Sequence, residues 1–336
     1  MTETVESDAG EAAPVAPPRQ CHCESYARAT EAAALLGARW LGRADQDSAE
    51  EAATTAMHGA LETLPIRGRI VIGGDERQLL AVGDVVGAGG DEVDLALDPL
   101  EGRGVVARGG HGAMSMIAVG EPGSLLALPS MYMRTLAVGP RARGKARLTD
   151  PPQQIVASVA EAFGRNVNDI TTIVLDRPRH HDLIEDLRAT GARIKLIPDG
   201  TVTASISAAI RGTNDHVAIG IGGTRQAIMS AAALRALGGE VQAQLWPTSR
   251  REIDLAREFG IDDVERVFTT EELAAGEVIV AATGVSNGDL LRGVRFYADS
   301  ARTHSLVMCT RCRWVRFVEG LHFFSPDRRE EVRLLG

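Results

Sequence analysis

The sequence has few aromatic residues and few cysteines, no long apolar run and no excess of positive charge. Without a run of about eighteen apolar residues, it offers no candidate membrane span. It does not begin with a basic segment followed by an apolar one, so we expect a cytoplasmic protein. The net charge of −9 argues against a general nucleic-acid binder, because phosphate backbones attract basic surfaces. An anionic small-molecule substrate would therefore need local screening by a metal or by arginine.

Only four cysteines are present, too few for a disulfide-stapled scaffold in a chain of this length. Cys21 and Cys23 stand near one end of the sequence, and Cys309 and Cys312 stand near the other. The C-x-C and C-x-x-C spacings each place two sulfurs within reach of one Zn²⁺ ion, and four thiolates complete its tetrahedron. Two interpretations stay open: a structural zinc site that joins the N-terminal helix to the C-terminal strands, and four free thiols.

The scarcity of aromatics, 4% against 44% apolar residues in all, predicts a core of Ala, Val, Leu and Ile. Such a core suits buried strands covered by helices, so we expect an α/β fold. Residues 1–22 are acidic and rich in Ala and Pro, which predicts a disordered tail. Residues 23–150 are expected to form one lobe, with two helices and a β-rich sheet that carries a metal site. Residues 151–336 alternate helix and strand patterns, which predicts a second α/β lobe that binds the substrate and includes the C-terminal strands.

Two helices are expected near the start of the first lobe, over about 25–41 and 48–64. Ser48 and Glu51 have the Ser-x-x-Glu spacing of a capping box, so we expect Ser48 to begin the second helix. From residue 69, short Val, Ile and Leu runs separated by Gly, Pro and Asp predict successive strands.

Asp98-Pro99-Leu100-Glu101-Gly102 follows a predicted strand and places two carboxylates around a turn. Mg²⁺ is commonly held by one or two protein carboxylates together with substrate phosphate, so this turn is a candidate metal site. The alternative is a polar turn with two solvated acids. Asp75 and Glu76 end a neighbouring strand and could converge on the same ion.

Two further strand ends carry groups that suit an anion. Gly222 and Gly223 belong to a Gly-x-Gly-Gly turn before a helix, where backbone N–H groups and the helix dipole face a ligand. Residues 177–181 read Arg-Pro-Arg-His-His, with two guanidiniums and two imidazoles that suit phosphate. A tight turn without a ligand and a solvated basic loop are the respective alternatives.

Eight stretches occur in order across residues 40–293: WLGRADQDSAEEAATTAM, RIVIGG, VDLALDPLEG, SMYMRTLAVGP, RPRHH, IPDG, GIGG and AATGVSNGDLLRG. Together they resemble the class II fructose-1,6-bisphosphatases, which belong to the lithium-sensitive sugar-phosphatase superfamily. The resemblance implies a layered αβαβα fold with mixed sheets sandwiched by helices, and a homo-oligomer. It also implies Mg²⁺ or Mn²⁺ and hydrolysis of the 1-phosphate of a ketose bisphosphate by activated water.

The same resemblance assigns roles to individual residues. The metal cradle falls on Asp98, the Leu100 carbonyl and Glu101, with a further ligand at Asp75 or Glu76. The acid that helps to activate water falls on Glu50, with Asp47 nearby. The substrate contacts fall on Tyr132, Arg177, Arg179 and Asp199, beside the glycine turn at Gly222 and Gly223.

The sequence departs from the family at its catalytic positions, which marks a divergent member. Gln226 stands where the family has an acidic ligand, Gln46 replaces a lysine, and Thr201 replaces an acidic sugar contact. Arg103 replaces a threonine that orients the attacking water. A guanidinium only donates hydrogen bonds and stays charged, so Arg103 cannot take over that role. It can instead pair with Asp98, Glu101 or a phosphate oxygen, and so substitute for a metal charge.

Three hypotheses follow from this combination. The first is a metal-dependent phosphatase of the fructose-bisphosphatase type, whose sugar-phosphate substrate has shifted. The second is a sugar-phosphate-binding homologue with impaired catalysis, and the third is changed chemistry on a sugar phosphate in a specialised pathway. Phosphate-monoester hydrolysis needs acceleration of up to about 10²¹-fold, so binding should survive the departures better than turnover.

Overall fold

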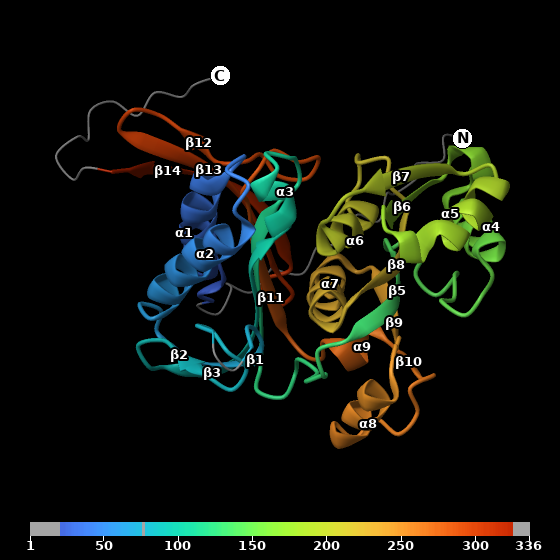
Figure 1. Ribbon diagram of the computed structural model, residues 1–336, viewed down its shortest axis with the longest axis horizontal. Helices are drawn as coiled ribbons and strands as arrows, with labels where there is room; N and C mark the ends of the chain where they lie inside the picture. The colour runs from blue at the N-terminus through green and yellow to red at the C-terminus, as the bar shows by residue number, and fades with distance from the viewer. Residues whose placement is uncertain (1–20, 76–77, 325–336) are drawn as a thin grey trace, which may run out of the picture.

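The computed structural model describes residues 21–75 and 78–324, which form five layers of helices and sheets (Figure 1). Helices, a first sheet, a pair of helices, a second sheet and a last pair of helices follow one another across the molecule. This arrangement confirms the expected layered αβαβα fold with two mixed sheets. Of the predicted tail, residues 1–20 lie outside the described residues.

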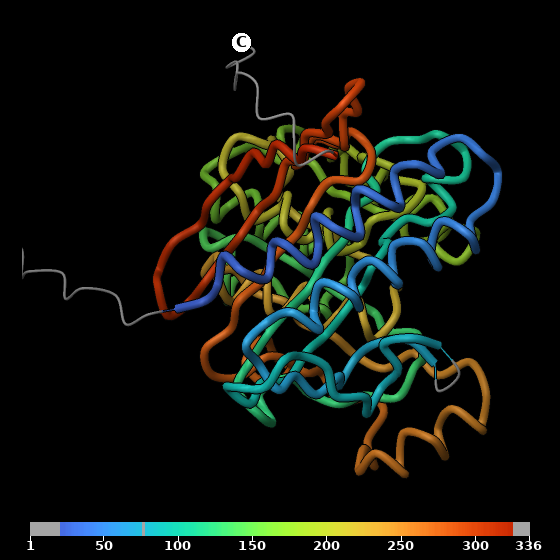
Figure 2. Tube along the Cα trace, turned by 90° about the vertical axis from the view of Figure 1, so that its left-hand side faces the viewer, coloured from blue at the N-terminus to red at the C-terminus, as the bar shows by residue number. Residues whose placement is uncertain are grey.

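The first sheet has eight strands in the order β12-β13-β11-β4-β3-β1-β2, with β14 paired to β13. Their bounds are β1 Ile66–Ile72, β2 Val85–Val86, β3 Asp91–Glu101, β4 Met114–Gly120, β11 Val278–Gly284, β12 Arg295–Phe296, β13 Ser300–Cys309 and β14 Trp314–Phe323. The helices α1 (Ala27–Gly37) and α2 (Gln46–Leu61) lie side by side on its outer face (Figure 2). Both helices bury a row of alanines, and such small side chains let a helix approach closely.

The second sheet has six strands in the order β10-β9-β5-β8-β6-β7. Their bounds are β5 Tyr132–Val138, β6 Thr171–Leu175, β7 Arg193–Ile197, β8 Val217–Gly223, β9 Glu240–Leu245 and β10 Val267–Phe268. The helices α4 (Pro152–Phe163) and α5 (His181–Ala189) cover its outer face, and α6 (Thr201–Ala209) and α7 (Thr224–Leu237) fill the space between the sheets (Figure 1). The short helices are α3 (Arg103–Ala107), α8 (Arg250–Glu258) and α9 (Thr270–Leu273).

The core between the sheets explains why α7 is apolar on most of its surface. Nine consecutive or near-consecutive residues of this helix are buried, because one sheet lies on each side of it. A helix that is hydrophobic all round is stable only when it is enclosed in this way. The ends of β3, β7 and β8, which lead into α3, α6 and α7, therefore meet around the same interior.

Strands of both sheets come from both sides of residue 150. The strand β5 precedes this residue and lies in the second sheet, whereas β11 to β14 follow it and complete the first sheet. The sheets therefore do not divide at the predicted boundary. That residues 23–150 and 151–336 form two separate lobes stays a prediction.

The start of α2 differs from the predicted capping box. Asp45 is the N-cap, and its carboxylate accepts hydrogen bonds from the Ser48 backbone N–H at 3.0 Å and the Ser48 hydroxyl at 2.7 Å. Ser48 therefore lies inside the helix, and the prediction that it forms a box with Glu51 is wrong. Asp and Ser are comparably good caps, and the earlier of the two residues begins the helix here.

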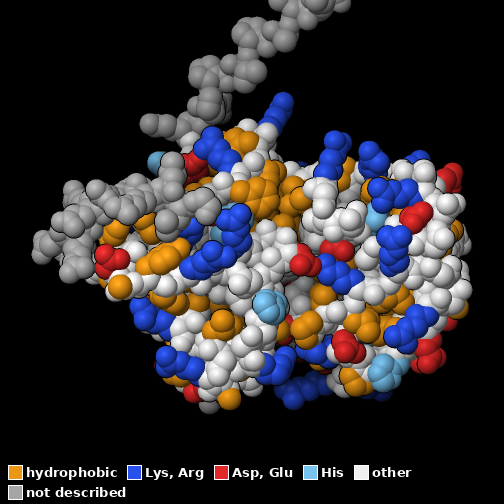
Figure 3. Space-filling model, turned by 90° about the horizontal axis from the view of Figure 1, so that it is seen from above, with side chains coloured by type: hydrophobic (Ala, Val, Ile, Leu, Met, Phe, Trp, Pro, Cys, Tyr) orange, Lys and Arg blue, Asp and Glu red, His pale blue; other side chains and the backbone are white. Residues whose placement is uncertain are grey.

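Strand β14 lies at an edge of the first sheet and pairs only with β13 among the described residues. Several of its large apolar side chains are exposed, among them Val315, Phe317 and Leu321. Figure 3 looks onto the end of the molecule where this strand lies and shows hydrophobic side chains on the surface among Arg and Lys. Within the described ranges, no helix is both long enough and apolar enough to cross a bilayer.

Candidate functional site

Asp98 and Glu101 lie at the end of β3, and the backbone there turns both side chains into the protein. The pairing of β3 with β4 shifts register between these two residues, which marks an irregularity in the strand. Gly102 follows with φ of 89°, a left-handed conformation that favours glycine, and leads directly into α3. Asp98 is 5% exposed and Glu101 is 3% exposed. The alternative of two solvated acids is therefore wrong.

The hydrogen-bond partners of Glu101 come from the first turn of α6. Its carboxylate accepts from the Val202 backbone N–H at 2.9 Å and from the Thr203 hydroxyl at 3.2 Å. Burial, followed by the nearby charge of Asp98, raises the pKa of Glu101 to about 8. No basic side chain forms an ion pair with Glu101 among the described residues.

Asp98 faces two residues at the start of α7. The Gln226 side-chain amide donates to its carboxylate at 3.4 Å, and a guanidinium nitrogen of Arg225 lies 4.0 Å from it. Burial raises the pKa of Asp98, and the charge of Arg225 opposes that rise. Arg225 approaches only Asp98, so keeping both buried carboxylates in their charged form is costly without a further cation. Their oxygen donors fit a hard divalent cation such as Mg²⁺ or Mn²⁺.

Arg103 does not pair with either of these carboxylates. Its guanidinium donates to Glu50 at 2.5 Å and lies 3.7 Å from Asp47. The expected ion pair with Asp98 or Glu101 is therefore wrong: α3 packs against α2, so the first residue of α3 faces the acids of α2. Arg225 occupies the position beside Asp98 instead. The glutamate assigned to water activation is thus held by an arginine.

A cavity of about 460 Å³ opens beside these side chains. Pro99 of the predicted metal turn lies on its wall, and its charged lining consists of Asp47, Glu50, Glu51, Arg103 and Arg225. This volume is in the range of small-molecule sites. Arg225 was not predicted from the sequence, because a lone arginine after a glycine turn has no distinguishing spacing. It also donates to the Gly73 carbonyl at 2.5 Å, which ties α7 to the turn after β1.

The remaining predicted metal ligands lie less favourably. Asp75 is exposed, and its backbone N–H bonds to the Gln78 side chain. Glu76 lies outside the described residues. Gln226 points its amide nitrogen toward Asp98, so it acts here as a donor. The structure thus gathers Asp98 and Glu101, with Leu100 between them, and leaves Asp75 at the surface.

The predicted substrate residues lie at neighbouring strand ends of the second sheet. Arg179 stacks over the Tyr132 ring at 5.0 Å and donates to the Ile221 carbonyl at 2.8 Å. Tyr132 in turn pairs with Gly223 across β5 and β8. Gly222 precedes Gly223 in β8. Arg177 lies on the same loop as Arg179 and donates a hydrogen bond to the Asp176 carbonyl.

Asp199 links this region to the carboxylates of β3. Its charge acts on the pKa of Asp98, Glu101, Arg103 and Arg179, so all five groups share one electrostatic neighbourhood. Gly200 follows with φ of 94° and begins α6, whose first turn bonds Glu101. We therefore expect the predicted metal turn and the predicted sugar-phosphate contacts to belong to one site between the two sheets.

His180 has a structural role instead of the predicted contact with phosphate. The side chain is buried, and its Nδ1 bonds to the Leu175 carbonyl at 2.8 Å. Its Nε2 accepts the Ile221 backbone N–H at 2.7 Å, which requires the neutral ring with the proton on Nδ1. Burial lowers the pKa of His180, consistent with a neutral ring. The residue therefore fixes the loop that carries Arg177 and Arg179 against β8.

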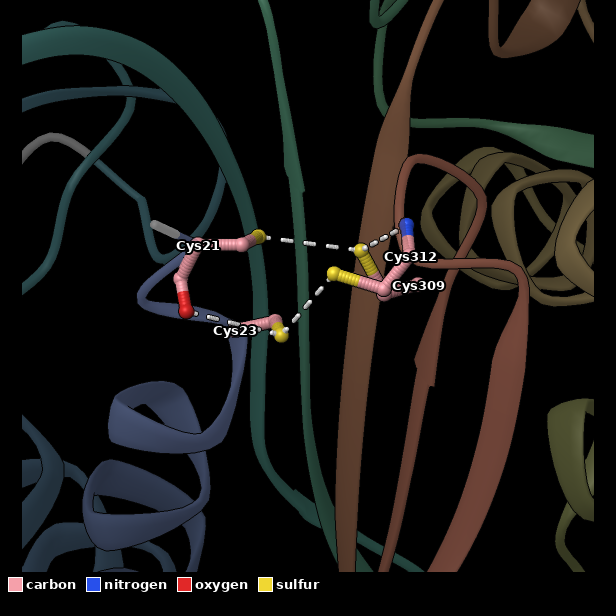
Figure 4. Close-up of side chains that lie close together, drawn as sticks. All are labelled: Cys21, Cys23, Cys309 and Cys312. Atoms are coloured by element: carbon pink, nitrogen blue, oxygen red, sulfur yellow. Dashed lines mark hydrogen bonds between the residues drawn. The ribbon is translucent and has the colours of Figure 1, made fainter. Parts of the chain in front are cut away.

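The four cysteines meet in space, as the first of the two interpretations requires (Figure 4). Their sulfur atoms all lie within 4.8 Å of one another. Over residues 21–75 and 78–324, they are the one group of three or more Cys, His, Asp or Glu side chains that is this compact.

Comparison of the chain with known proteins shows the family to which it belongs. The family of bacterial, glpX-encoded fructose-1,6-bisphosphatases matches residues 20–322. A D-fructose 1,6-bisphosphatase class 2/sedoheptulose 1,7-bisphosphatase of Synechococcus sp. (strain JA-3-3Ab) is 42% identical, over 90% of this chain and 96% of its own. The D-fructose 1,6-bisphosphatase class 2/sedoheptulose 1,7-bisphosphatase 2 of Acaryochloris marina (strain MBIC 11017) is 39% identical, over 90% of this chain and 95% of its own. The resemblance read from the motifs is thereby confirmed, and the chain belongs to the bacterial, glpX-encoded fructose-1,6-bisphosphatase family.

Proposed function

We propose that this protein is a metal-dependent phosphatase that hydrolyses a phosphomonoester of a ketose bisphosphate. The observation that carries the proposal is the buried pair Asp98 and Glu101, which lacks sufficient positive charge of its own. The relatives are named for fructose 1,6-bisphosphate and sedoheptulose 1,7-bisphosphate, so these two sugars are the first substrates to test.

Asp98, Glu101 and the Leu100 carbonyl are the proposed ligands of Mg²⁺ or Mn²⁺. When bound, the ion supplies positive charge to the phosphate and lowers the pKa of a water molecule. Gln226 contacts Asp98, and Asp75 follows Gly74 on the wall of the cavity, so both can add oxygen donors if their side chains turn toward the ion. Thr203 holds the Glu101 carboxylate in place through its hydroxyl.

The substrate is proposed to lie between these carboxylates and the Tyr132–Arg179 pair. Arg177 and Arg179 carry the charge that a second, non-reacting phosphate needs, because guanidinium groups bind phosphate through two parallel hydrogen bonds. Asp199 is positioned to accept from sugar hydroxyls, and the Gly222–Gly223 backbone lets a ligand approach without a side chain in the way. Glu50, as an ionised carboxylate, is the base available to take a proton from water.

A second candidate function is supported by the two arginines of the cavity. Arg103 occupies Glu50, and Arg225 lies beside Asp98 where a metal charge would act. The Arg225 contact reduces the need for a cation beside Asp98, and the Arg103 contact hinders proton transfer to Glu50. They favour a protein that binds a sugar phosphate and turns it over slowly or not at all.

Phosphate release from a panel of sugar mono- and bisphosphates, with Mg²⁺ and with Mn²⁺, separates the two functions. The proposal predicts release that requires a divalent cation and is lost on chelation. Calorimetric binding of the same sugars without a cation and without release would instead establish the second function. Neither binding nor release across the panel would contradict both.

We also propose that the protein forms a homo-oligomer and works in the cytoplasm. The exposed apolar side chains of β14, at the edge of the first sheet, suit an interface between two copies. Membership of the bacterial fructose-1,6-bisphosphatase family supports the location. Analytical ultracentrifugation tests the first statement: a dimer or larger species supports it, and a monomer at micromolar concentration contradicts it.

A further inference from the structure

The cysteine cluster joins parts of the chain that are far apart in sequence. Cys21 and Cys23 precede α1, Cys309 ends β13, and Cys312 lies in the turn between β13 and β14. In Figure 2 the blue start of the described chain lies beside the red C-terminal hairpin, and Figure 4 shows the two pairs facing each other. The two close contacts span 288 and 289 residues of sequence.

The spacing of the sulfurs matches that of a single tetrahedral ion. The Cys21 and Cys309 sulfurs lie 3.8 Å apart, and so do those of Cys23 and Cys312. With Zn–S bonds of about 2.3 Å, a tetrahedron places its sulfurs about 3.8 Å apart. The maximum separation of 4.8 Å leaves no room for a cluster of several iron atoms. The arrangement is therefore close to a zinc geometry before any ion is added.

We propose that Cys21, Cys23, Cys309 and Cys312 bind one structural Zn²⁺ ion. Four thiolates are the donor set that zinc takes in closed structural sites, where no position stays open for water or substrate. Cys23 and Cys309 are buried, whereas Cys21 and Cys312 are partly exposed, which gives the ion a path of entry. The Cys312 backbone N–H also donates to the Cys309 sulfur at 3.4 Å, a contact that stabilises a bound thiolate.

The position of the cluster in the sheet makes its role structural. Cys309 pairs with Ile279, which pairs with Val119 on β4, and Val119 pairs with Leu95 on β3. Cys309 is therefore three strands away from Asp98 and three residues further along, a separation of about 17 Å at ordinary strand spacings. A bound zinc would link the segment before α1 to the C-terminal hairpin, at the end of the sheet remote from the carboxylates.

The experiment measures bound metal in the purified full-length protein, grown with added zinc and dialysed against Mg²⁺ buffer. We expect about one zinc per chain by mass spectrometry. Cys312→Ser should lose the zinc, whereas Arg311→Ala, a change in the same turn at a non-ligand, should keep it. The loss should also lower Tm by on the order of 5 °C.

A second measurement covers the case in which the serine variant fails to fold. The wild-type protein is stripped of zinc and reloaded with Co²⁺, whose visible spectrum reports a tetrahedral thiolate site. A tetrahedral thiolate spectrum supports the proposal. Iron in place of zinc, two disulfides in place of free thiols, or an octahedral Co²⁺ spectrum would each overturn it. Because these readouts do not involve turnover, they are independent of the phosphatase activity.

Discussion

The two ends of the first sheet gather different atoms for different purposes. At one end β3 buries two carboxylates, whose oxygens suit hard cations such as Mg²⁺ or Mn²⁺. At the other end β13 and its turn present sulfurs, which suit Zn²⁺. At the first end two arginines already neutralise acidic groups, since Arg225 approaches Asp98 and Arg103 pairs with Glu50. Over the described residues, the side chains whose charge acts on Cys23 and Cys309 are the other cysteines. If both proposals hold, one sheet separates a site that exchanges ligands from a closed structural site.

The largest effect is expected for Asp98→Asn. The change removes a carboxylate ligand, so phosphate release should fall on the order of 10³-fold. The fold should survive, because the amide has the same shape and removes a buried charge. Glu92→Gln, on the same strand but exposed, is the matched control and should keep full activity. Activity of Asp98→Asn within about tenfold of the wild type would exclude Asp98 as a ligand.

The double variant Arg103→Thr with Gln226→Glu should raise turnover by on the order of 10- to 100-fold. It releases Glu50 from its ion pair, restores a hydroxyl and adds an acidic ligand. The measurement is kcat with Mg²⁺ and with Mn²⁺ at saturating sugar bisphosphate. Arg108→Thr, an exposed arginine at the end of the same helix, provides the control. If the double variant loses activity instead, Arg103 takes part in turnover and does not hinder the metal-dependent reaction.

Replacing Arg179 by alanine should raise KM for a sugar bisphosphate about tenfold and leave kcat within about threefold. The guanidinium is expected to bind the phosphate that does not react, so its loss weakens binding in the ground state and the transition state alike. Arg188→Ala, on the exposed side of α5, should change neither constant. A tenfold fall in kcat with no change in KM would instead place Arg179 at the reacting phosphate.

The pH dependence of stability tests the charge at Glu101. Its pKa in the folded protein is about 8, above the unfolded value of 4.5, so the folded state holds a proton that the unfolded state releases between these values. Without divalent cations, the free energy of unfolding should therefore fall as pH rises from 5 to 8, by at most about 1.4 kcal/mol per pH unit from this group. Urea denaturation of the wild type and Glu101→Gln measures the slope, which the variant should lose. Equal slopes for the two proteins would show that the pKa of Glu101 is not raised in the folded state.

The layers and the carboxylate turn were accessible from sequence because they depend on local patterns. Strand and helix periods predicted the alternation, and the turn around Pro99 predicted that Asp98 and Glu101 face one point. Arg225 could not be found in this way, because its approach to Asp98 depends on how α7 packs between the sheets. The partner of Arg103 was missed for the same reason: Glu50 is distant in sequence and comes from a packed neighbouring helix.

The cysteine cluster could be predicted only in part from the sequence. Their spacings indicated two pairs of metal ligands, but the meeting of the pairs depends on long-range strand pairing that no local pattern contains. The start of α2 was misplaced because two good capping residues stand three positions apart, and the local sequence does not decide between them.

Anomalous X-ray diffraction from one crystal of the protein with Mn²⁺, Zn²⁺ and a sugar bisphosphate tests the central claim most directly. Data on both sides of each metal's absorption edge identify the ion at each end of the sheet. The account predicts manganese between Asp98 and Glu101, with the sugar phosphate reaching Arg179, and zinc among the four sulfurs. A phosphate held by Arg103 and Arg225 with no manganese at the carboxylates would contradict the metal-dependent phosphatase.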